Sequence, residues 1–204
     1  RALTALPLLI AVATFAGFRH YGHPTFGIGG PLATPWLAAL LCTPLVIALR
    51  AVNAATCQPI ADAVIDVWHC DAGGLYSGHN LAVDEAIQET SHTPPVNGDR
   101  HCRGALRTDA DGIAEFRSIY PGYYVERAIH IHFKVHIGNR AFMTNQALLP
   151  ESDNAAVMAM APYNRPRKGK RIANAQEADW GLPTMKLALR QQTRLVVMDL
   201  ALSV

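Results

Sequence analysis

The stretch IHIHFKVH, residues 129–136, alternates apolar and polar side chains without interruption. Such alternation is typical of a β-strand, in which residues two apart share a face and lie about 6.6 Å from each other. His130 and His132 therefore point the same way, and two imidazoles at this spacing can bind one metal ion. Taken alone, the pattern is more typical of a strand with one solvated face, so a metal site requires further ligands elsewhere in the chain.

Two tyrosine-bearing turns can supply such ligands. Tyr76 lies in GGLYSG, residues 73–78, and Tyr124 closes YPGYY, residues 120–124, six residues before His130. Each tyrosine could instead pack over its turn, as tyrosines do in β-sandwiches. A phenolate is a hard anionic oxygen ligand, so two phenolates with two imidazoles suit Fe(III) better than zinc.

The segments that must position these residues are short, apolar runs separated by turns. The ADG turn at residues 110–112 predicts a hairpin of the runs on either side of it, and residues 139–148 are expected to pair with residues 129–136. The polar stretch from Gly78 to Arg100 predicts a long loop that is either functional or disordered. The fold class expected is all-β, a β-sandwich of mostly antiparallel strands with long active-site loops. Strands are expected at residues 45–52, 62–68, 103–109, 113–119, 129–136, 139–148, 185–192 and 193–204, and a short helix at residues 153–160.

The first residues of the chain differ from the rest. Residues 2–18 form a nearly unbroken apolar run, somewhat shorter than the ~20 residues that a membrane-spanning helix needs. We interpret residues 1–43 as an apolar N-terminal segment, signal-like or membrane-anchoring, ahead of one domain at residues 44–204; a buried helix would explain the same hydropathy. The protein is therefore expected to be exported or tethered to a membrane, and otherwise cytoplasmic.

Composition and cysteine content narrow the function classes further. Half of the residues are hydrophobic and 17% are charged, which excludes disorder for most of the chain. A formal net charge of +2 provides no basic field, so no nucleic-acid partner is expected. Absence of a Cys-x-x-Cys pair argues against a structural zinc site. The cysteines allow three full pairings in an exported protein, or they are buried thiols: Cys42, Cys57, Cys70 and Cys102.

Several motifs, in order along the chain, together resemble the intradiol ring-cleavage dioxygenases, the family of the catechol and protocatechuate 3,4-dioxygenases. The resemblance runs from about Pro44 to the mid-150s and is strongest to short members without the helical dimerisation segment. The motifs are CQPIADAVIDVWHCDAGGLYSG, RGALRTDADGIAEFRSIYPGYYVERAIHIHFKVH and TNQALLP, with weaker similarity in APYNR and ANAQEADW.

The resemblance implies an enzyme that uses O₂ to cleave a catechol-type diol to a cis,cis-muconate-type product. It implies that Arg127, three residues before the first histidine, and Gln146, on the following strand, assist the reaction. It is also compatible with a homodimer. The cofactor that it implies is non-haem Fe(III), held by Tyr76, Tyr124, His130 and His132.

Two other functions stay open from the sequence. A non-catalytic prealbumin-like binding module would share the pattern that includes Pro59, Thr108 and Pro121, and a shared fold does not by itself give a function. Such a module has no use for Tyr76 together with the His-x-His pair. A copper or zinc protein could use that pair with His136, and its tyrosines would then be dispensable for retaining the metal.

Overall fold

The computed structural model describes residues 42–79, 97–124, 126–166, 169–190 and 193–204. The apolar segment predicted at residues 1–43 lies almost wholly outside these ranges, as does most of the loop predicted between Gly78 and Arg100. In the described part of the chain, no helix has the length and hydropathy of a membrane span.

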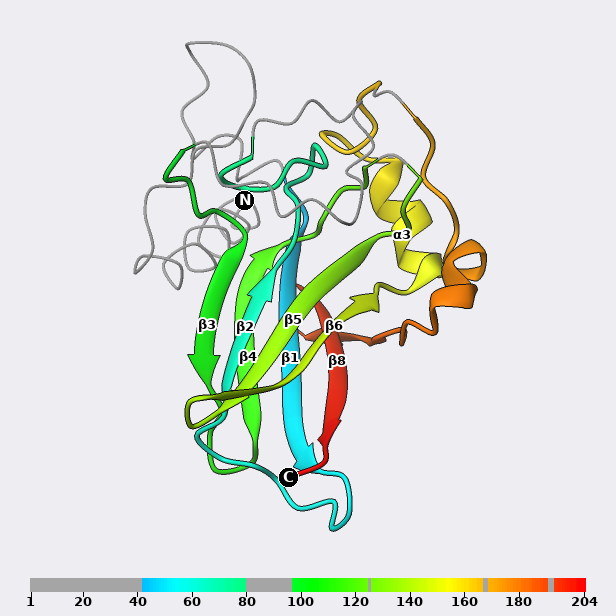
Figure 1. Ribbon diagram of the computed structural model, residues 1–204. Coiled ribbons are helices and arrows are strands. Elements are labelled where there is room, and N and C mark those ends of the chain that lie inside the picture. Colours follow the sequence, from blue (N-terminus) through cyan, green and yellow to red (C-terminus); the bar gives the residue numbers. More distant parts are fainter. Residues whose placement is uncertain (1–41, 80–96, 125, 167–168, 191–192) are drawn as a thin grey trace, which may run out of the picture.

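The described strands form two four-stranded sheets that face each other (Figure 1). The β1 sheet has the order β4-β1-β8-β7: β4 is Ile113–Ile119, β1 is Pro44–Asn53, β8 is Thr193–Leu202 and β7 is Lys186–Arg190. The β5 sheet has the order β3-β2-β5-β6: β3 is Arg103–Arg107, β2 is Val64–Trp68, β5 is His130–Ile137 and β6 is Arg140–Leu148. The predicted β-sandwich is confirmed.

Alternation along the strands builds the core between the sheets. On β5, Ile131, Phe133 and Val135 are buried, whereas the residues between them face away from the core. The same period is seen on β2, where Ile65 and Val67 point inward. Burying such apolar side chains stabilises the folded state by roughly 1.5–3 kcal/mol each. His132, Lys134 and His136 of β5 thereby lie on the outer face of the β5 sheet.

All neighbouring strand pairs are antiparallel except β1 and β8, which run parallel. The hairpin predicted between β5 and β6 is confirmed. The hairpin predicted around residues 110–112 is wrong, because β3 pairs with β2 and β4 pairs with β1, so this turn connects the two sheets. The turn itself is tight, with a hydrogen bond from Gly112 N to Asp109 O of 3.0 Å. The strand after the turn joins the β1 sheet, where its Ala114 and Phe116 are buried in the core.

Two helical segments lie beside one end of the sandwich (Figure 1). The helix α3, Glu151–Met158, begins close to the expected position, and η1, Asn174–Trp180, is a 3₁₀ helix. Glu151 joins the two, since its carboxylate accepts hydrogen bonds from Asn174 N at 3.0 Å and Arg171 Nη2 at 2.6 Å. Asp153 of α3 binds Arg194 of β8 at 2.7 Å. These contacts hold α3 against the segment of Arg171 and Asn174 and against β8 of the sandwich.

The cysteines form no disulfide, and all four lie in described residues. Cys42, Cys70 and Cys102 are buried and Cys57 is exposed. The sequence leaves open whether these cysteines form disulfides or remain thiols, and in the structure they are thiols.

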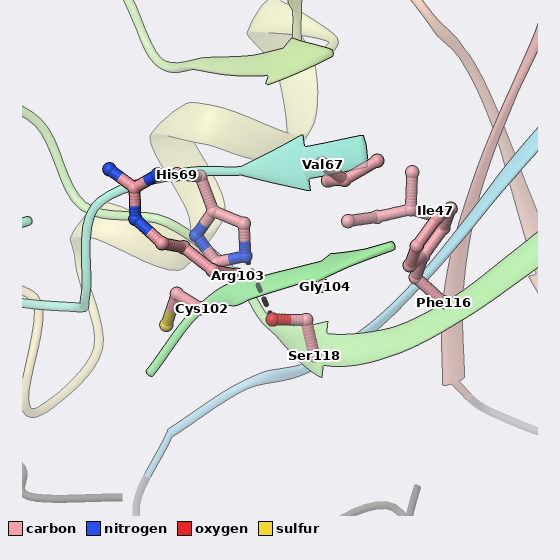
Figure 2. A pocket seen from close by; sticks show the side chains of 8 residues that line it. All are labelled: Ile47, Val67, His69, Cys102, Arg103, Gly104, Phe116 and Ser118. Atoms are coloured by element: carbon pink, nitrogen blue, oxygen red, sulfur yellow. Dashed lines mark hydrogen bonds between the residues drawn. The ribbon is translucent and has the colours of Figure 1, made fainter. Parts of the chain in front are cut away.

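A small hollow between the two sheets is lined by residues of β1, β2, β3 and β4 and of the segments next to them (Figure 2). Both ring nitrogens of His69 have partners there, Nε2 at 2.8 Å from Ser118 Oγ and Nδ1 at 2.7 Å from Cys70 O. Burial lowers the pKa of His69 to about 4, so the ring is neutral at physiological pH. His69 is thus a hydrogen-bonded core histidine. The hollow is lined by Ile47, Val67, His69, Cys102, Arg103, Gly104, Phe116 and Ser118.

Candidate metal centre

One cross-strand row on the outer face of the β5 sheet forms the floor of the site. Trp68 of β2 lies opposite His132 of β5, which in turn lies opposite Gln146 of β6. Residues directly opposite on antiparallel strands share a face, so these three side chains project to the same side. His130 projects beside them from the first position of β5, two residues earlier. Strand register, rather than a local motif, therefore brings Gln146 to the histidines.

Glycines place the two tyrosine-bearing turns above this row. Gly74 has φ +89°, and a Cβ atom there would lie 2.2 Å from Tyr123 O, so only glycine permits this approach. A Cβ on Gly122 would lie 2.5 Å from Ala72 O. Asp71 ties both turns together, because its backbone oxygen accepts hydrogen bonds from Gly74 N at 3.1 Å and Gly122 N at 2.9 Å. The turns that carry Tyr76 and Tyr124 thus pack backbone against backbone.

Hydrogen bonds of the Asp71 and His130 side chains also position the site. Asp71 Oδ1 accepts hydrogen bonds from the backbone N–H groups of Gly73 and Leu75, at 2.8 and 2.9 Å. This fixes the loop immediately before Tyr76. On β5, His130 Nδ1 lies 2.8 Å from Ala128 O, which makes Nδ1 the protonated nitrogen and directs the Nε2 lone pair toward the tyrosines.

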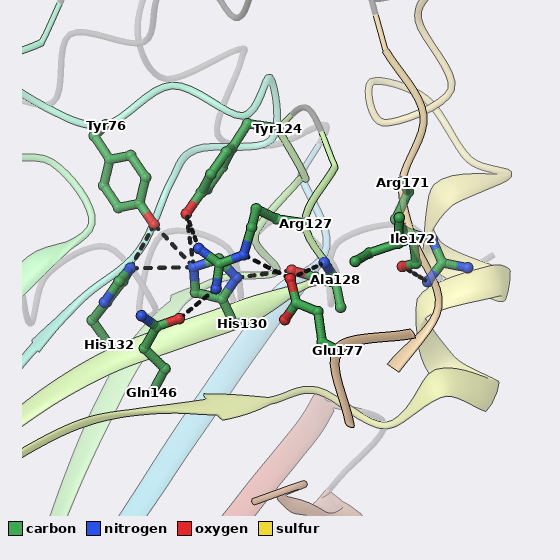
Figure 3. A network of polar contacts seen from close by, with 10 residues as sticks. All are labelled: Tyr76, Tyr124, Arg127, Ala128, His130, His132, Gln146, Arg171, Ile172 and Glu177. Carbon is green, nitrogen blue, oxygen red and sulfur yellow. Dashed lines mark hydrogen bonds and ion pairs between the residues drawn. The ribbon is translucent and has the colours of Figure 1, made fainter. Parts of the chain in front are cut away.

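Four donor atoms converge where the row and the turns meet (Figure 3). Tyr124 Oη lies 3.0 Å from His130 Nε2, and Tyr76 Oη lies 2.9 Å from His132 Nε2 and 3.4 Å from His130 Nε2. The two Nε2 atoms are 3.2 Å apart. These two imidazoles and two phenols come from a strand and two loops that are widely separated in the sequence.

Arg127 lies against this group and is held at three points. Its Nη1 donates to Tyr124 Oη at 3.1 Å and its Nη2 donates to Gln146 Oε1 at 2.6 Å. Its Nε donates to Glu177 Oε1 at 2.6 Å, an ion pair in which the side chains are 11% and 2% exposed. The guanidinium also lies over the Tyr124 ring, with its central carbon 5.7 Å from the ring centroid. All six residues predicted for the site therefore come together in space.

No protein-family model matches the chain. Over 109 residues the chain is 29% identical to catechol 1,2-dioxygenase 1 of Acinetobacter lwoffii, a match that covers 44% of this chain and 30% of that protein. The match thus spans less than a third of the relative's length.

Solved structures share the fold of the chain. An intradiol ring-cleavage dioxygenase from Tetranychus urticae superposes with a TM-score of 0.68 at 23% identity, over 79% of this chain and 81% of the other. The dioxygenase domain of a dioxygenase and carbohydrate-binding protein fusion from Streptomyces sp. SirexAA-E gives 0.51 at 24% identity, over 80% and 81%. The chain has the intradiol dioxygenase fold. The resemblance of its sequence to that family is confirmed.

Burial within this intradiol dioxygenase fold sets the protonation states of the four donors. Desolvation lowers the pKa of His130 to about 3 and that of His132 to about 2, with the Arg127 charge acting in the same direction on both. Both imidazoles are therefore neutral at physiological pH, the state that binds a metal. Desolvation raises the pKa of Tyr124 to about 12, against the opposing effect of Arg127, and raises that of Tyr76 well above its usual range. Metal-free tyrosines at these positions are thus protonated.

The donor set fits a metal ion with nitrogen and hard oxygen ligands. Donors bound to one ion at about 2.0–2.1 Å, with mutual angles of about 90–110°, lie about 2.8–3.4 Å from each other. The contacts among Tyr76, Tyr124, His130 and His132 measure 2.9, 3.0, 3.2 and 3.4 Å. Among the described residues, no group of three or more His, Cys, Asp or Glu side chains is placed to hold a metal ion.

Sequence reasoning missed Asp71, Trp68 and Glu177. The signal for Asp71 is the turn-forming sequence Asp-Ala-Gly-Gly that it begins. Glu177 lies within ANAQEADW, a segment with weaker similarity to the family. Nothing in the local sequence around Glu177 indicates its contact with Arg127, fifty positions away.

Proposed function

We propose that this protein is a non-haem Fe(III)-dependent dioxygenase that cleaves a catechol-type diol with O₂ to a cis,cis-muconate-type product. The observation that carries the proposal is the convergence of two phenols and two imidazoles through contacts of 2.9–3.4 Å, with the guanidinium of Arg127 against one of the phenols. The fold and the sequence similarity to a catechol 1,2-dioxygenase support it.

The chain's own residues supply the ligands and the surrounding charge. Ferric iron held by Tyr76, Tyr124, His130 and His132 would act as the Lewis acid that activates a bound catecholate toward O₂. Tyr124 Oη, as a phenolate, is placed to take a proton from a substrate hydroxyl. Arg127 Nη1, 3.1 Å from that oxygen, stabilises negative charge there.

Further hydrogen bonds hold Arg127 and His130 in place in the absence of substrate. Gln146 Oε1 fixes Arg127 Nη2, and Ala128 O fixes the His130 ring. Such preorganised groups around a metal site orient its ligands and are worth about 10- to 100-fold in affinity or activity.

The two alternative functions have less support. A binding module gives no reason for the convergence of Tyr76 and Tyr124 on the two histidines. His136 lies four residues beyond His132 on β5, about 13 Å away along the strand, and so does not reach the four donors. A histidine-only copper or zinc site is therefore disfavoured.

The test is the colour of the iron-loaded protein, since a ferric tyrosinate absorbs visible light by charge transfer from ligand to metal. We expect a reddish protein after ferric reconstitution, an anaerobic spectral change on adding catechol, and consumption of O₂ on admitting air. Tyr76→Phe and His132→Ala should lose most of the colour. Tyr123→Phe and His136→Ala are the matched controls, and both should keep it.

A protein that stays colourless after ferric reconstitution would overturn the proposal. Undiminished retention of copper or zinc in both the Tyr76→Phe and the Tyr124→Phe variants would favour the histidine-based copper or zinc site. Export or a membrane tether, a homodimer and the lack of a nucleic-acid partner stay predictions that rest on the sequence alone.

A further inference from the structure

Glu177 is a buried carboxylate that reaches the candidate metal centre from η1. Its side chain is 2% exposed, and it enters from a segment that contributes none of the four donor atoms. Figure 3 shows the carboxylate between Arg127 and the backbone of Ala128. A charged side chain this deeply buried is rare unless it is paired, so its partners indicate what it does.

One oxygen of Glu177 makes both of its contacts. Oε1 accepts from Arg127 Nε at 2.6 Å and from Ala128 N at 2.9 Å. Ala128 O in turn lies 2.8 Å from His130 Nδ1. A single carboxylate oxygen thus connects the guanidinium that touches Tyr124 with the peptide unit that orients His130.

The geometry of Arg127 depends on this contact. A guanidinium is planar, so fixing Nε sets the plane in which both Nη atoms lie. With Nε on Glu177, Nη1 meets Tyr124 Oη at 3.1 Å and Nη2 meets Gln146 Oε1 at 2.6 Å. Of the three acceptors, Glu177 is a carboxylate, and charge-assisted bonds are roughly twice as strong as neutral ones.

The ion pair also has an energetic cost that packing does not explain. Oε2 of Glu177 is buried and has no hydrogen-bond partner among the described residues. A buried ion pair is often no more stabilising than apolar residues of similar volume, and an unsatisfied buried oxygen adds about 1–3 kcal/mol of cost. Because stability does not explain the burial of Glu177, we look for its role in its contacts at the candidate metal centre.

We propose that Glu177 is a positioning residue of the metal centre, which holds Arg127 on Tyr124 and offsets its positive charge. The inference rests on the proposed function. Without Glu177, the guanidinium would lose its fixed plane, and an uncompensated cation would lie against a site that must accept a ferric ion. Glu177 acts through Arg127 and does not itself touch the donors.

The test compares Glu177→Gln and Glu177→Ala in the iron-loaded protein. Glu177→Gln keeps an acceptor oxygen and removes the charge, whereas Glu177→Ala removes both. We expect a shifted charge-transfer band and a kcat lower by about 10-fold in Glu177→Gln, and by up to about 100-fold in Glu177→Ala. KM should change less than kcat, because Arg127 stabilises charge that develops during the reaction.

Asp153→Asn is the matched control, because it breaks a comparable ion pair, Asp153 with Arg194 at 2.7 Å, away from the donors. It should lower thermal stability and leave the charge-transfer band and kcat unchanged. A merely structural Glu177 would behave in the same way. A second check is the Arg127→Met variant, on which Glu177→Gln should have little further effect on kcat, because the two residues act as one unit.

A crystal structure of the metal-free Glu177→Ala or Glu177→Gln protein separates this inference from the proposed function. The inference expects Arg127 to leave Tyr124 Oη, whether or not the protein is a dioxygenase. An unmoved guanidinium, or wild-type kcat and spectrum in both Glu177 variants, would overturn the positioning role. A wild-type protein that binds no iron would overturn the proposed function instead.

Discussion

Trp68 and His132 lie directly opposite each other on β2 and β5, and their rings stack with centroids 5.1 Å apart and planes inclined by 7°. Arg103 of β3 lies opposite Trp68 on its other side, with its guanidinium carbon 5.9 Å from the indole centroid. The indole thus fixes the plane of an imidazole whose Nε2 is one of the four converging donors.

Replacing Trp68 should therefore loosen His132 without removing a ligand. We expect Trp68→Ala to weaken ferric binding by about 10-fold or more, and Trp68→Phe, which keeps a stacking ring, to lose less. Competition for iron against a chelator, followed by visible absorbance, measures the difference. Equal affinity in the wild type and Trp68→Ala would show that the stack does not orient the histidine.

Gly74 and Gly138 provide a matched pair of substitutions. Both have positive φ, +89° and +57°, but a Cβ on Gly74 meets Tyr123 O at 2.2 Å, whereas a Cβ on Gly138 meets nothing within 4 Å. Gly138→Ala should cost about 1 kcal/mol of unfolding free energy from backbone strain alone. Gly74→Ala should cost about 3 kcal/mol or more, and should also reduce iron uptake, because the clash separates the turns that carry Tyr76 and Tyr124.

Chemical denaturation of the two glycine variants measures these costs. If Gly74→Ala were no less stable than Gly138→Ala and took up iron normally, the close contact between the two turns would not be required for the site.

Gln146 should affect turnover more than iron binding. Its Oε1 accepts from Arg127 Nη2 at 2.6 Å, but the residue is not among the four converging donors. We expect Gln146→Ala to keep the colour and to lower kcat by about 10-fold. Thr144→Ala is the control, since Thr144 lies two residues earlier on the same face of β6 and is exposed. A colourless Gln146→Ala protein would instead indicate a direct role in binding the metal.

The metal-free protein should lose stability as the pH falls from about 6.5. The pKa values of His69, His130 and His132 are lowered by burial to about 4, 3 and 2, so in this range the unfolded chain binds protons that the folded chain does not. The free energy of unfolding should fall by about 1.4 kcal/mol per pH unit for each such histidine. Urea unfolding at pH 7 and pH 5 in the presence of a chelator measures this.

His69→Gln isolates one of these contributions outside the metal centre. Glutamine can keep hydrogen bonds of the kind that His69 makes with Ser118 and Cys70, but it does not titrate. The loss of stability between pH 7 and pH 5 should be smaller in this variant, while the values at pH 7 and pH 8 should agree with each other in both proteins. An unchanged acid slope would mean that folding does not lower the pKa of His69.

The sequence determined the strands and the direction in which their side chains point. The observed β4, Ile113–Ile119, coincides with the predicted strand, and the other strand boundaries differ from prediction by at most two residues. Alternation with a period of two is a local property, and it alone assigned His130 and His132 to one face and Ile131 to the core.

The tertiary structure decided which strands are partners and which distant groups meet. Nothing within residues 103–119 indicates that the strand after the turn pairs with β1 rather than with β3, because this choice depends on the burial available across the whole sandwich. The contact of Glu177 with Arg127 and the stacking of Trp68 on His132 have the same origin. Hydrogen bonds and ring contacts between remote segments depend on how the sheets and loops pack. The alternation of residues along a single strand carries no information about that packing.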